Sequence, residues 1–206
     1  LEAARREFVG KVSHDLRTPL TIIKGYAFTL ERGARDLDDR RRLVAIGRET
    51  DRLAALVDDL LTLAQAGAGA LHVTCAPVSA HELLEEIGER VRTLAGERAV
   101  AVEIEQADRA LVFDGDRRRL GQVLINLATN AVAHSPVGTA VRLAIRPDRE
   151  RVELCVEDRG CGIDPALVPQ LLEPFARGGN AYGGAGLGLA IANELVLAHG
   201  GALALE

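Results

Sequence analysis

The sequence predicts an α+β protein in two parts, an N-terminal helical hairpin followed by an α/β sandwich. Over residues 1–66, apolar residues recur at alternating spacings of three and four, which is typical of helical bundles and coiled coils. From residue 71 to residue 206, short apolar runs alternate with longer amphipathic ones, which indicates mixed strands and helices. The alanine and glycine run over 66–70 breaks the helical pattern and marks the boundary.

We expect two long helices in the first part. In the first helix the repeating positions are Val9, Val12, Leu16, Pro19, Ile23, Tyr26 and Leu30. In the second they are Leu43, Ile46, Thr50, Leu53, Val57, Leu60 and Ala64. A glycine stop and capping aspartates separate them over residues 33–39. Two helices of about 30 residues bury too little surface to be stable alone, so we expect a homodimer through residues 1–66 that forms a four-helix bundle.

The second part is expected to form a sheet with helices on one of its faces. The expected strands cover residues 71–76, 100–105, 111–113, 141–146 and 152–157. The expected helices cover residues 80–94, 117–134 and 187–199.

Composition excludes several classes of protein. The net charge is −5, so nucleic acid held by a basic surface is not expected. No apolar run approaches the ~20 residues of a membrane span, so we expect no membrane contact by this chain. The 3 cysteines do not form a disulfide framework, which favours free thiols in a reducing compartment.

His14 is the most informative residue of the first part. Its position lies away from the apolar seam, and a surface histidine is the simplest interpretation of it alone. Its neighbours favour chemistry. Asp15 can orient the imidazole or accept its proton, and a neutral imidazole is a competent nucleophile. Thr18, one turn further, can position a water, and Pro19 should bend the helix just beyond.

An asparagine pair marks the expected helix over 117–134. Asn126 and Asn130 stand one turn apart on a flank of its buried stripe. An amide oxygen is a ligand that suits Mg²⁺, although a pair of surface amides is the simpler alternative.

Two glycine-containing segments follow. Asp158 ends an expected strand and precedes Gly160 and Gly162, an arrangement that can bind an exocyclic amine and a flat ring or can be a plain turn. The glycines over 183–191 run into a helix start, which is either an anion site or a flexible connection.

Taken together, these motifs resemble the cytoplasmic catalytic core of the sensor histidine kinases of two-component systems. The matching segments are SHDLRTPL over 13–20 (H box), LGQVLINLATNAVAHSP over 120–136 (N box), DRGCG over 158–162 (G1 box), EPF over 173–175 with Arg177 (F box) and GAGLGL over 184–189 (G2 box). The order of the boxes and their joint presence make the resemblance specific.

The resemblance implies a dimerisation and histidine-phosphotransfer domain over 1–66 and a Bergerat (GHKL-type) ATP-binding domain over 71–206. It implies a truncated last strand, since the family usually continues beyond the equivalent of residue 206. ATP and Mg²⁺ would be the cofactors, and a response regulator receiver domain the partner. The chain would be a cytoplasmic fragment whose parent is anchored in the inner or plasma membrane.

The resemblance also implies roles for individual residues. His14 would be the phosphoacceptor, Asp15 its acid/base partner and Thr18 a residue for dephosphorylating the regulator. Asn130 would hold Mg²⁺. The expected nucleotide-binding set is Asn126, Asn130, His134, Asp158, Gly160, Gly162, Phe175, Arg177, Gly184, Gly186, Leu187 and Gly188. A lysine common in the family is replaced by Ala133, and His134 or Arg177 would compensate.

ATP hydrolases of the gyrase, Hsp90 and MutL families share the implied fold, but they carry a glutamate that activates water at the position of Asn126. This chain has no such base, which excludes that class. A dimeric nucleotide-binding or scaffolding module without catalysis is the remaining alternative.

Overall fold

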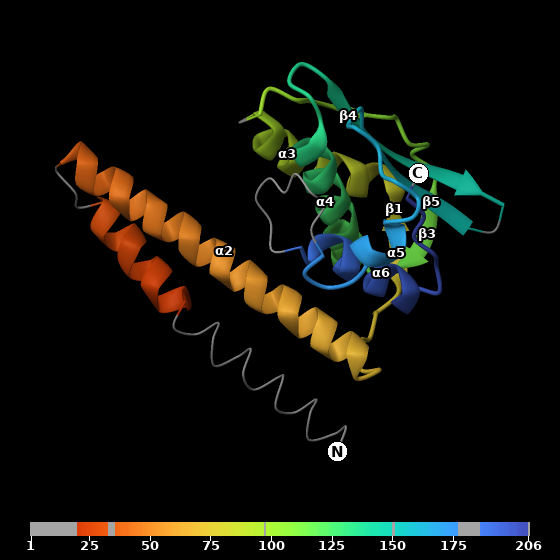
Figure 1. Cartoon of the computed structure of the whole chain (residues 1–206), viewed down its shortest axis with the longest axis horizontal. Helices are drawn as coiled ribbons and strands as arrows, with labels where there is room; N and C mark the ends of the chain where they lie inside the picture. Colours follow the sequence, from red (N-terminus) through yellow and green to blue (C-terminus); the bar gives the residue numbers. More distant parts are fainter. Residues whose placement is uncertain (1–19, 33–35, 97, 150, 177–185, 206) are drawn as a thin grey trace. The chain divides into compact units, whose positions relative to one another are not determined.

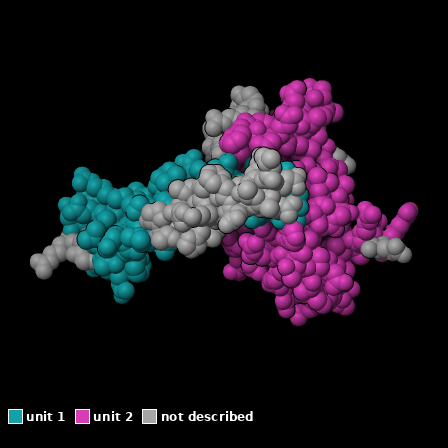
Figure 2. Space-filling view, turned by 90° about the horizontal axis from the view of Figure 1, so that it is seen from below, with its two compact units in different colours: residues 1–71 teal, residues 72–206 magenta. Residues whose placement is uncertain are grey.

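The computed structural model describes residues 20–32, 36–96, 98–149, 151–176 and 186–205. The chain divides into two compact units, residues 1–71 and residues 72–206 (Figure 2). The expected seam positions Val9, Val12, Leu16 and Pro19 lie outside the described residues.

Unit 1 contains a helix over residues 20–32 and α2 (Leu37–Gly67). The side chain of Asp36 caps α2 by accepting a hydrogen bond from the Asp38 N–H at 3.0 Å. An ion pair joins the two helices, with 2.6 Å between Lys24 Nζ and Asp51 Oδ1. The helical hairpin expected from the spacing is therefore present in the described part of this unit.

The end of α2 is closed by a glycine turn. The Ala70 N–H donates to the Gln65 carbonyl and the Gly69 N–H donates to the Ala66 carbonyl, both at 2.8 Å. Gly69 has a φ of 62°, which is the left-handed conformation this Schellman turn needs. The turn holds the chain to α2 as far as Ala70.

Unit 2 contains two small sheets and four helices in its described residues (Figure 1). β1 (Ala76–Ser79) pairs antiparallel with β3 (Val112–Gly115). β4 (Ala140–Asp148) lies between β2 (Ala101–Ile104), to which it is parallel, and β5 (Arg151–Glu157), to which it is antiparallel. The helices are α3 (Ala80–Gly96), α4 (Arg117–His134), α5 (Val168–Leu171) and α6 (Gly188–Ala198).

The core of unit 2 lies between α3, α4 and the sheet of β2, β4 and β5. Its fully buried side chains include Leu83, Leu84, Ile87, Val91, Leu124, Val141 and Leu143. α6 packs on α4 through a second apolar set that includes Ile191 and Leu195, both 0% exposed. The expected α+β architecture is confirmed, and α4 lies at its centre.

One expected strand was wrong. The segment 71–76 was expected to be a strand, but β1 begins only at Ala76, where pairing with Gly115 of β3 starts. The apolar alternation of the earlier residues has no partner strand in the described part of the chain, so the backbone from residue 71 to residue 75 is irregular. The short helix α5 was not expected at all.

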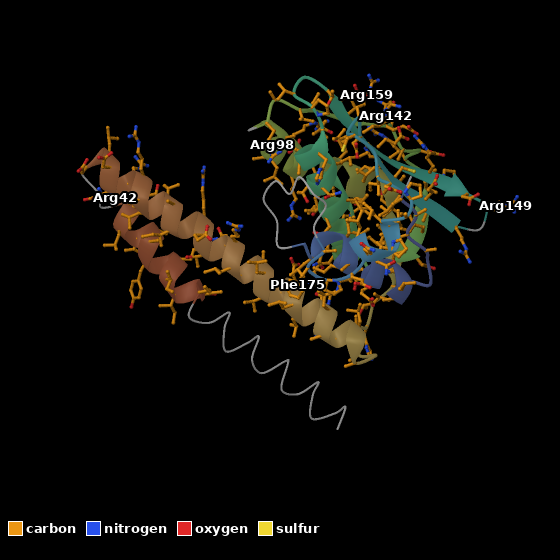
Figure 3. All side chains as sticks on the ribbon, viewed as in Figure 1. Arg42, Arg98, Arg142, Arg149, Arg159 and Phe175 are labelled. Atoms are coloured by element: carbon orange, nitrogen blue, oxygen red, sulfur yellow. The ribbon has the colours of Figure 1, made fainter. Side chains whose placement is uncertain are left out.

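Charged side chains cover one stretch of the larger sheet. Arg146 donates to Glu105 Oε2 at 2.6 Å and to Glu157 Oε1 at 3.1 Å, and Arg142, labelled in Figure 3, donates to Glu103 at 3.3 Å. The hydrogen bond from Arg146 lowers the pKa of Glu105. These exposed pairs orient β2, β4 and β5 but contribute little to stability individually.

Cys155 is expected to react more slowly with thiol reagents than the other two cysteines of the chain. Burial, followed by its interaction with Glu153, raises its pKa to about 11, whereas Cys75 and Cys161 are exposed. Only a thiolate reacts readily, so titration with a coloured disulfide reagent at pH 8 should show two fast thiols and one slow one. A Cys155→Ser variant should lose the slow phase alone, and three equally fast thiols in the parent chain would contradict the assignment.

Among the helices that the structure describes, none combines the length and the apolar character needed to cross a membrane.

Candidate functional site

The candidate site is built on α4. Asp116 caps this helix, its side chain accepting from the Arg119 N–H at 3.1 Å, and a buried apolar stripe holds the helix against the core. Asn126 and Asn130 are half-buried one turn apart, as their spacing predicts. The Nδ2 atom of Asn126 is buried and has no hydrogen-bond partner among the described residues. A buried amide without a partner is costly, which indicates that this position is completed by a ligand.

The start of α6 meets α4 at Asn126. A Cβ atom placed on Gly188 would lie 3.7 Å from Asn126 Cβ and 3.8 Å from its Cγ, so the two residues are in contact. Leu187 is 2% exposed and precedes the helix without a side-chain cap. Backbone N–H groups at an uncapped helix start, beside a side-chain amide, suit an anionic ligand.

The glycine turn before α6 also requires its glycine. Gly186 has a φ of 71°, and a Cβ there would lie 2.5 Å from the Ala176 carbonyl oxygen and 2.9 Å from the Phe175 carbonyl carbon. The Phe175 N–H donates to the Gly186 carbonyl at 2.8 Å. The backbone just before and just after segment 177–185 is thereby joined. Arg177 and Gly184 lie outside the described residues.

The turn after β5 reaches the other end of α4. The Gly160 N–H donates to Asp158 Oδ1 at 2.6 Å. A Cβ on Gly160 would lie 2.8 Å from that oxygen and 3.1 Å from the His134 carbonyl oxygen, so only a residue without a side chain fits without a shift. Gly162 has a φ of 75°, which favours glycine. Asp158 and His134 are exposed.

These contacts give the site an elongated form along α4. Asn126 and Gly188 lie at one end, and His134, Asp158 and Gly160 lie at the other. Along the helix axis, Asn126 and His134 lie about 12 Å apart. Such a surface presents amide and N–H donors at one end and a carboxylate acceptor at the other, and it therefore suits an elongated ligand with an anionic end and an amine-bearing end.

Sequence reasoning brought out the glycines and asparagines of the site but missed one residue beside it. The Arg98 Nη1 donates to the Ala133 carbonyl at 3.0 Å and so satisfies a free carbonyl at the end of α4 (Figure 3). Arg98 is 35 residues away from Ala133 in the sequence, and no local pattern marks the contact.

The three residues expected to act on phosphate, His14, Asp15 and Thr18, lie outside the described residues. No cluster of three or more histidine, cysteine or acidic side chains placed to hold a metal ion occurs within the described ranges.

Replacing Gly160 with alanine is expected to weaken binding at the carboxylate end. The added methyl would push Asp158 away from its position or move the turn off His134, so we expect affinity for an adenine nucleotide to fall about tenfold. Calorimetric titration would measure it. The matched control is Gly96→Ala, since a Cβ on Gly96 meets nothing within 4 Å. Equal affinities for the two variants would contradict the assignment.

Comparison with known proteins places both units in families. Residues 4–69 match the family model of the His Kinase A (phospho-acceptor) domain. Residues 115–206 match the model of the histidine kinase-, DNA gyrase B-, and HSP90-like ATPase. A solved structure of the mycobacterial sensor histidine kinase MprB is 32% identical, with 62% of this chain and 81% of that chain covered and a TM-score of 0.52. The chain belongs to the sensor histidine kinases.

Two further relatives of this histidine kinase extend the likeness over the whole chain. Sensor protein DivL of Caulobacter vibrioides is 37% identical over 100% of this chain. The structure of full-length ShkA in complex with AMPPNP is 33% identical and covers 94% of this chain and 41% of that chain, with a TM-score of 0.78. The chain spans 26% to 46% of the length of the first curated relatives it matches. The resemblance drawn from the five boxes is thus confirmed.

Proposed function

We propose that this histidine kinase core moves the γ-phosphoryl group of ATP to His14 and then to an aspartate on a response regulator. The observation that supports it most is the arrangement along α4. Gly188 meets the unpartnered amide of Asn126 at one end, and Gly160 joins Asp158 to His134 at the other. The separation matches a nucleotide with its phosphates at the first end and its base at the second.

The nucleotide residues take roles that follow from this arrangement. Asp158 accepts a hydrogen bond from the adenine amine, and Gly160 and Gly162 leave room for the ring. Asn126 and Leu187 lie at the phosphate end with Gly186 and Gly188 of the G2 box. Gly184 is assigned to phosphate binding from its place in that motif alone. Phe175 fixes the F-box end of the segment that contains Arg177, whose charge offsets that of the γ-phosphate. His134 follows Ala133, which stands where the family commonly has a lysine, and its polar side chain compensates for that lysine.

Mg²⁺ fits this donor set. Asn130 offers an amide oxygen one turn from Asn126, and the described residues near it supply no cluster of carboxylates. Mg²⁺ keeps several waters and is often held by few protein groups together with substrate phosphates. When bound, Mg²⁺ would neutralise charge on the phosphates. The role of the protein would be to hold the ion through Asn130.

The proposed transfer uses residues of both units. A neutral imidazole nitrogen of His14 forms a bond to the γ-phosphorus while the bond from phosphorus to the bridging oxygen of ADP breaks. Asp15 accepts the imidazole proton. Hydrolysis is disfavoured because related ATPases carry a glutamate that activates water at the position where this chain has Asn126. Dephosphorylation of the regulator through Thr18 is a secondary activity that follows from the same H box.

The apolar seam of unit 1 supports a homodimer. Several of its residues are exposed in the single chain: Ile23, Tyr26, Leu30, Ile46, Leu53 and Leu60. Tyr26 is the most exposed of these six residues, at 68%. A row of large apolar side chains at helical spacing needs a cover, and a second copy of the same hairpin supplies a complementary one in a four-helix bundle. We further propose that the parent protein is anchored in the membrane with this part on the cytoplasmic side.

The function is tested by the chemistry of the product. The chain is incubated with Mg²⁺ and ATP labelled at the γ-phosphorus, and the protein-bound label is treated with acid and with base. A phosphoramidate on histidine is lost in acid and survives base, which is the expected result. Label that resists acid, or binding of ATP without any label, would overturn the kinase in favour of the scaffold.

A further inference from the structure

The segment that enters unit 2 is held by the cap of α4. Oδ1 of Asp116 accepts from the Arg119 N–H, within the helix, at 3.1 Å. Oδ2 accepts from the backbone N–H of Thr74, also at 3.1 Å, across 42 residues of sequence. Burial alone would raise the pKa of Asp116, but these two N–H groups and the charges of Arg118 and Arg119 lower it. One ionised carboxylate therefore joins the entering segment to the start of α4.

His199 joins a third element to the same point. The Asp116 N–H donates to His199 Nε2 at 3.1 Å, and His199 Nδ1 lies 2.7 Å from the Leu195 carbonyl oxygen. Because Nε2 accepts, the ring proton lies on Nδ1, which donates to Leu195. His199 directly follows α6, so its ring connects the end of α6 to the start of α4.

The two helices of the nucleotide site are thus in contact at two levels. Gly188 contacts Asn126 at the phosphate end of the site, and His199 contacts Asp116 at the start of α4. The stretch from Asp116 to Asn126 spans about 15 Å, and the 11 residues of α6 span about 16 Å, so both contacts form without bending either helix. The Asp116 carboxylate extends this bracing to Thr74.

The other side of the connection is also fixed. The glycine turn holds the chain to α2 as far as Ala70, and the Asp116 carboxylate holds it to unit 2 from Thr74. Residues 71–73 are thus the chain between these two held points. A short connection between two fixed points has fewer conformations than a long one.

We propose that Asp116 and His199 are positioning residues for phosphoryl transfer, which fix the entry of unit 2 to α4 and α6 and so restrict the orientations in which bound ATP approaches His14. The inference rests on the proposed function. Neither residue is assigned to contact ATP. Their effect on the rate comes from limiting the search for a productive geometry, to which transfer reactions are sensitive.

The first test removes the hydrogen bond from Thr74 and the charge of Asp116 but keeps the helix cap. In Asp116→Asn, the amide oxygen still caps α4 as well as a carboxylate does, but the NH₂ group cannot accept from Thr74. The matched control is Asp114→Asn, the same chemical change at an exposed residue of β3 two positions earlier. Autophosphorylation is measured over a range of ATP concentrations, together with the melting temperature.

We expect Asp116→Asn to lower the rate at saturating ATP about tenfold while KM for ATP stays within about twofold of the parent. Asp114→Asn should match the parent in both. A purely structural role would lower the melting temperature and raise KM without this split, and that pattern, or an unchanged rate, would overturn the proposal.

The second test addresses His199. His199→Leu removes the acceptor for the Asp116 N–H, whereas the Oε1 atom of His199→Gln reaches the position of Nε2 and restores it. We expect the leucine variant to lose rate at saturating ATP like Asp116→Asn and the glutamine variant to recover most of it. Equal rates for the two variants would count against the role of the ring nitrogen.

A third measurement does not depend on kinase activity. Spin labels at Ala55 of α2 and Asp148 of β4, both exposed, report the spread of distances between the units in a chain whose three cysteines are serine. Asp116→Asn should broaden that distribution, and Asp114→Asn should not. An unbroadened distribution overturns the positioning role, whereas broadening in a chain that takes no label from ATP would place the failure in the proposed function instead.

Discussion

His14→Gln is expected to abolish label transfer from ATP, with a loss of roughly a thousandfold or more, because glutamine has no nucleophilic nitrogen to replace the imidazole. Binding of a nonhydrolysable ATP analogue should not change. His14 belongs to unit 1, while the asparagines, glycines and carboxylate of the nucleotide site all belong to unit 2. Phosphorimaging of the protein band and calorimetry of analogue binding provide the two measurements.

The two readouts separate the nucleophile from the nucleotide site. A chain that retains acid-labile label after His14→Gln would have another phosphoacceptor. A chain that loses analogue binding as well would have been damaged in its fold, which circular dichroism would reveal. His81, in unit 2, provides the control, and His81→Gln should retain full labelling.

Gly186→Ala is expected to weaken nucleotide binding strongly while the rest of unit 2 stays folded. A φ of 71° costs an L-residue roughly 1–2 kcal/mol, and the new methyl would lie 2.5 Å from the Ala176 carbonyl oxygen. Because that neighbour is backbone, it cannot rotate away. Either the Phe175 to Gly186 hydrogen bond breaks or the start of α6 moves off Asn126, and we expect ATP affinity to fall about a hundredfold.

A matched glycine separates the two causes. Gly138 also has a positive φ, of 82°, but a Cβ there meets nothing within 4 Å. Gly138→Ala should therefore show the conformational cost as a lower melting temperature and leave ATP affinity near that of the parent. If both variants bind ATP equally well, the turn at Gly186 does not shape the phosphate end of the site.

The three long helices of unit 2, α3, α4 and α6, were predictable because their signals are local. α4 begins and ends at the expected residues, since Asp116 provides a cap, an apolar stripe runs through the helix and Ser135-Pro136 stops it. β1 was misplaced because apolar alternation suggested a strand from residue 71, while its position is decided by pairing with β3. Pro77 within β1 is tolerated because the two-stranded sheet consists only of edges.

The candidate site was predictable as a set of residues but not as an arrangement. Glycine and asparagine spacing selected the residues on α4, after β5 and before α6. The contact of Gly160 with the His134 carbonyl and that of Gly188 with Asn126 join segments that are distant in the sequence, and no period or cap encodes them. The same applies to the hydrogen bond between Asp116 and His199, across 83 residues.

The hydrogen bond from Phe175 to Gly186 also bears on how this family can diversify. Because Phe175 and Gly186 are joined directly, we expect the number of residues between them to have little effect on the helices that carry the amides. Doubling the number of residues between two joined points costs only about 0.6 kcal/mol in closure entropy. Segment 177–185 is therefore expected to be replaceable. Insertions, deletions or grafts from other kinases between Ala176 and Gly186 should leave α4 and α6 folded as they are.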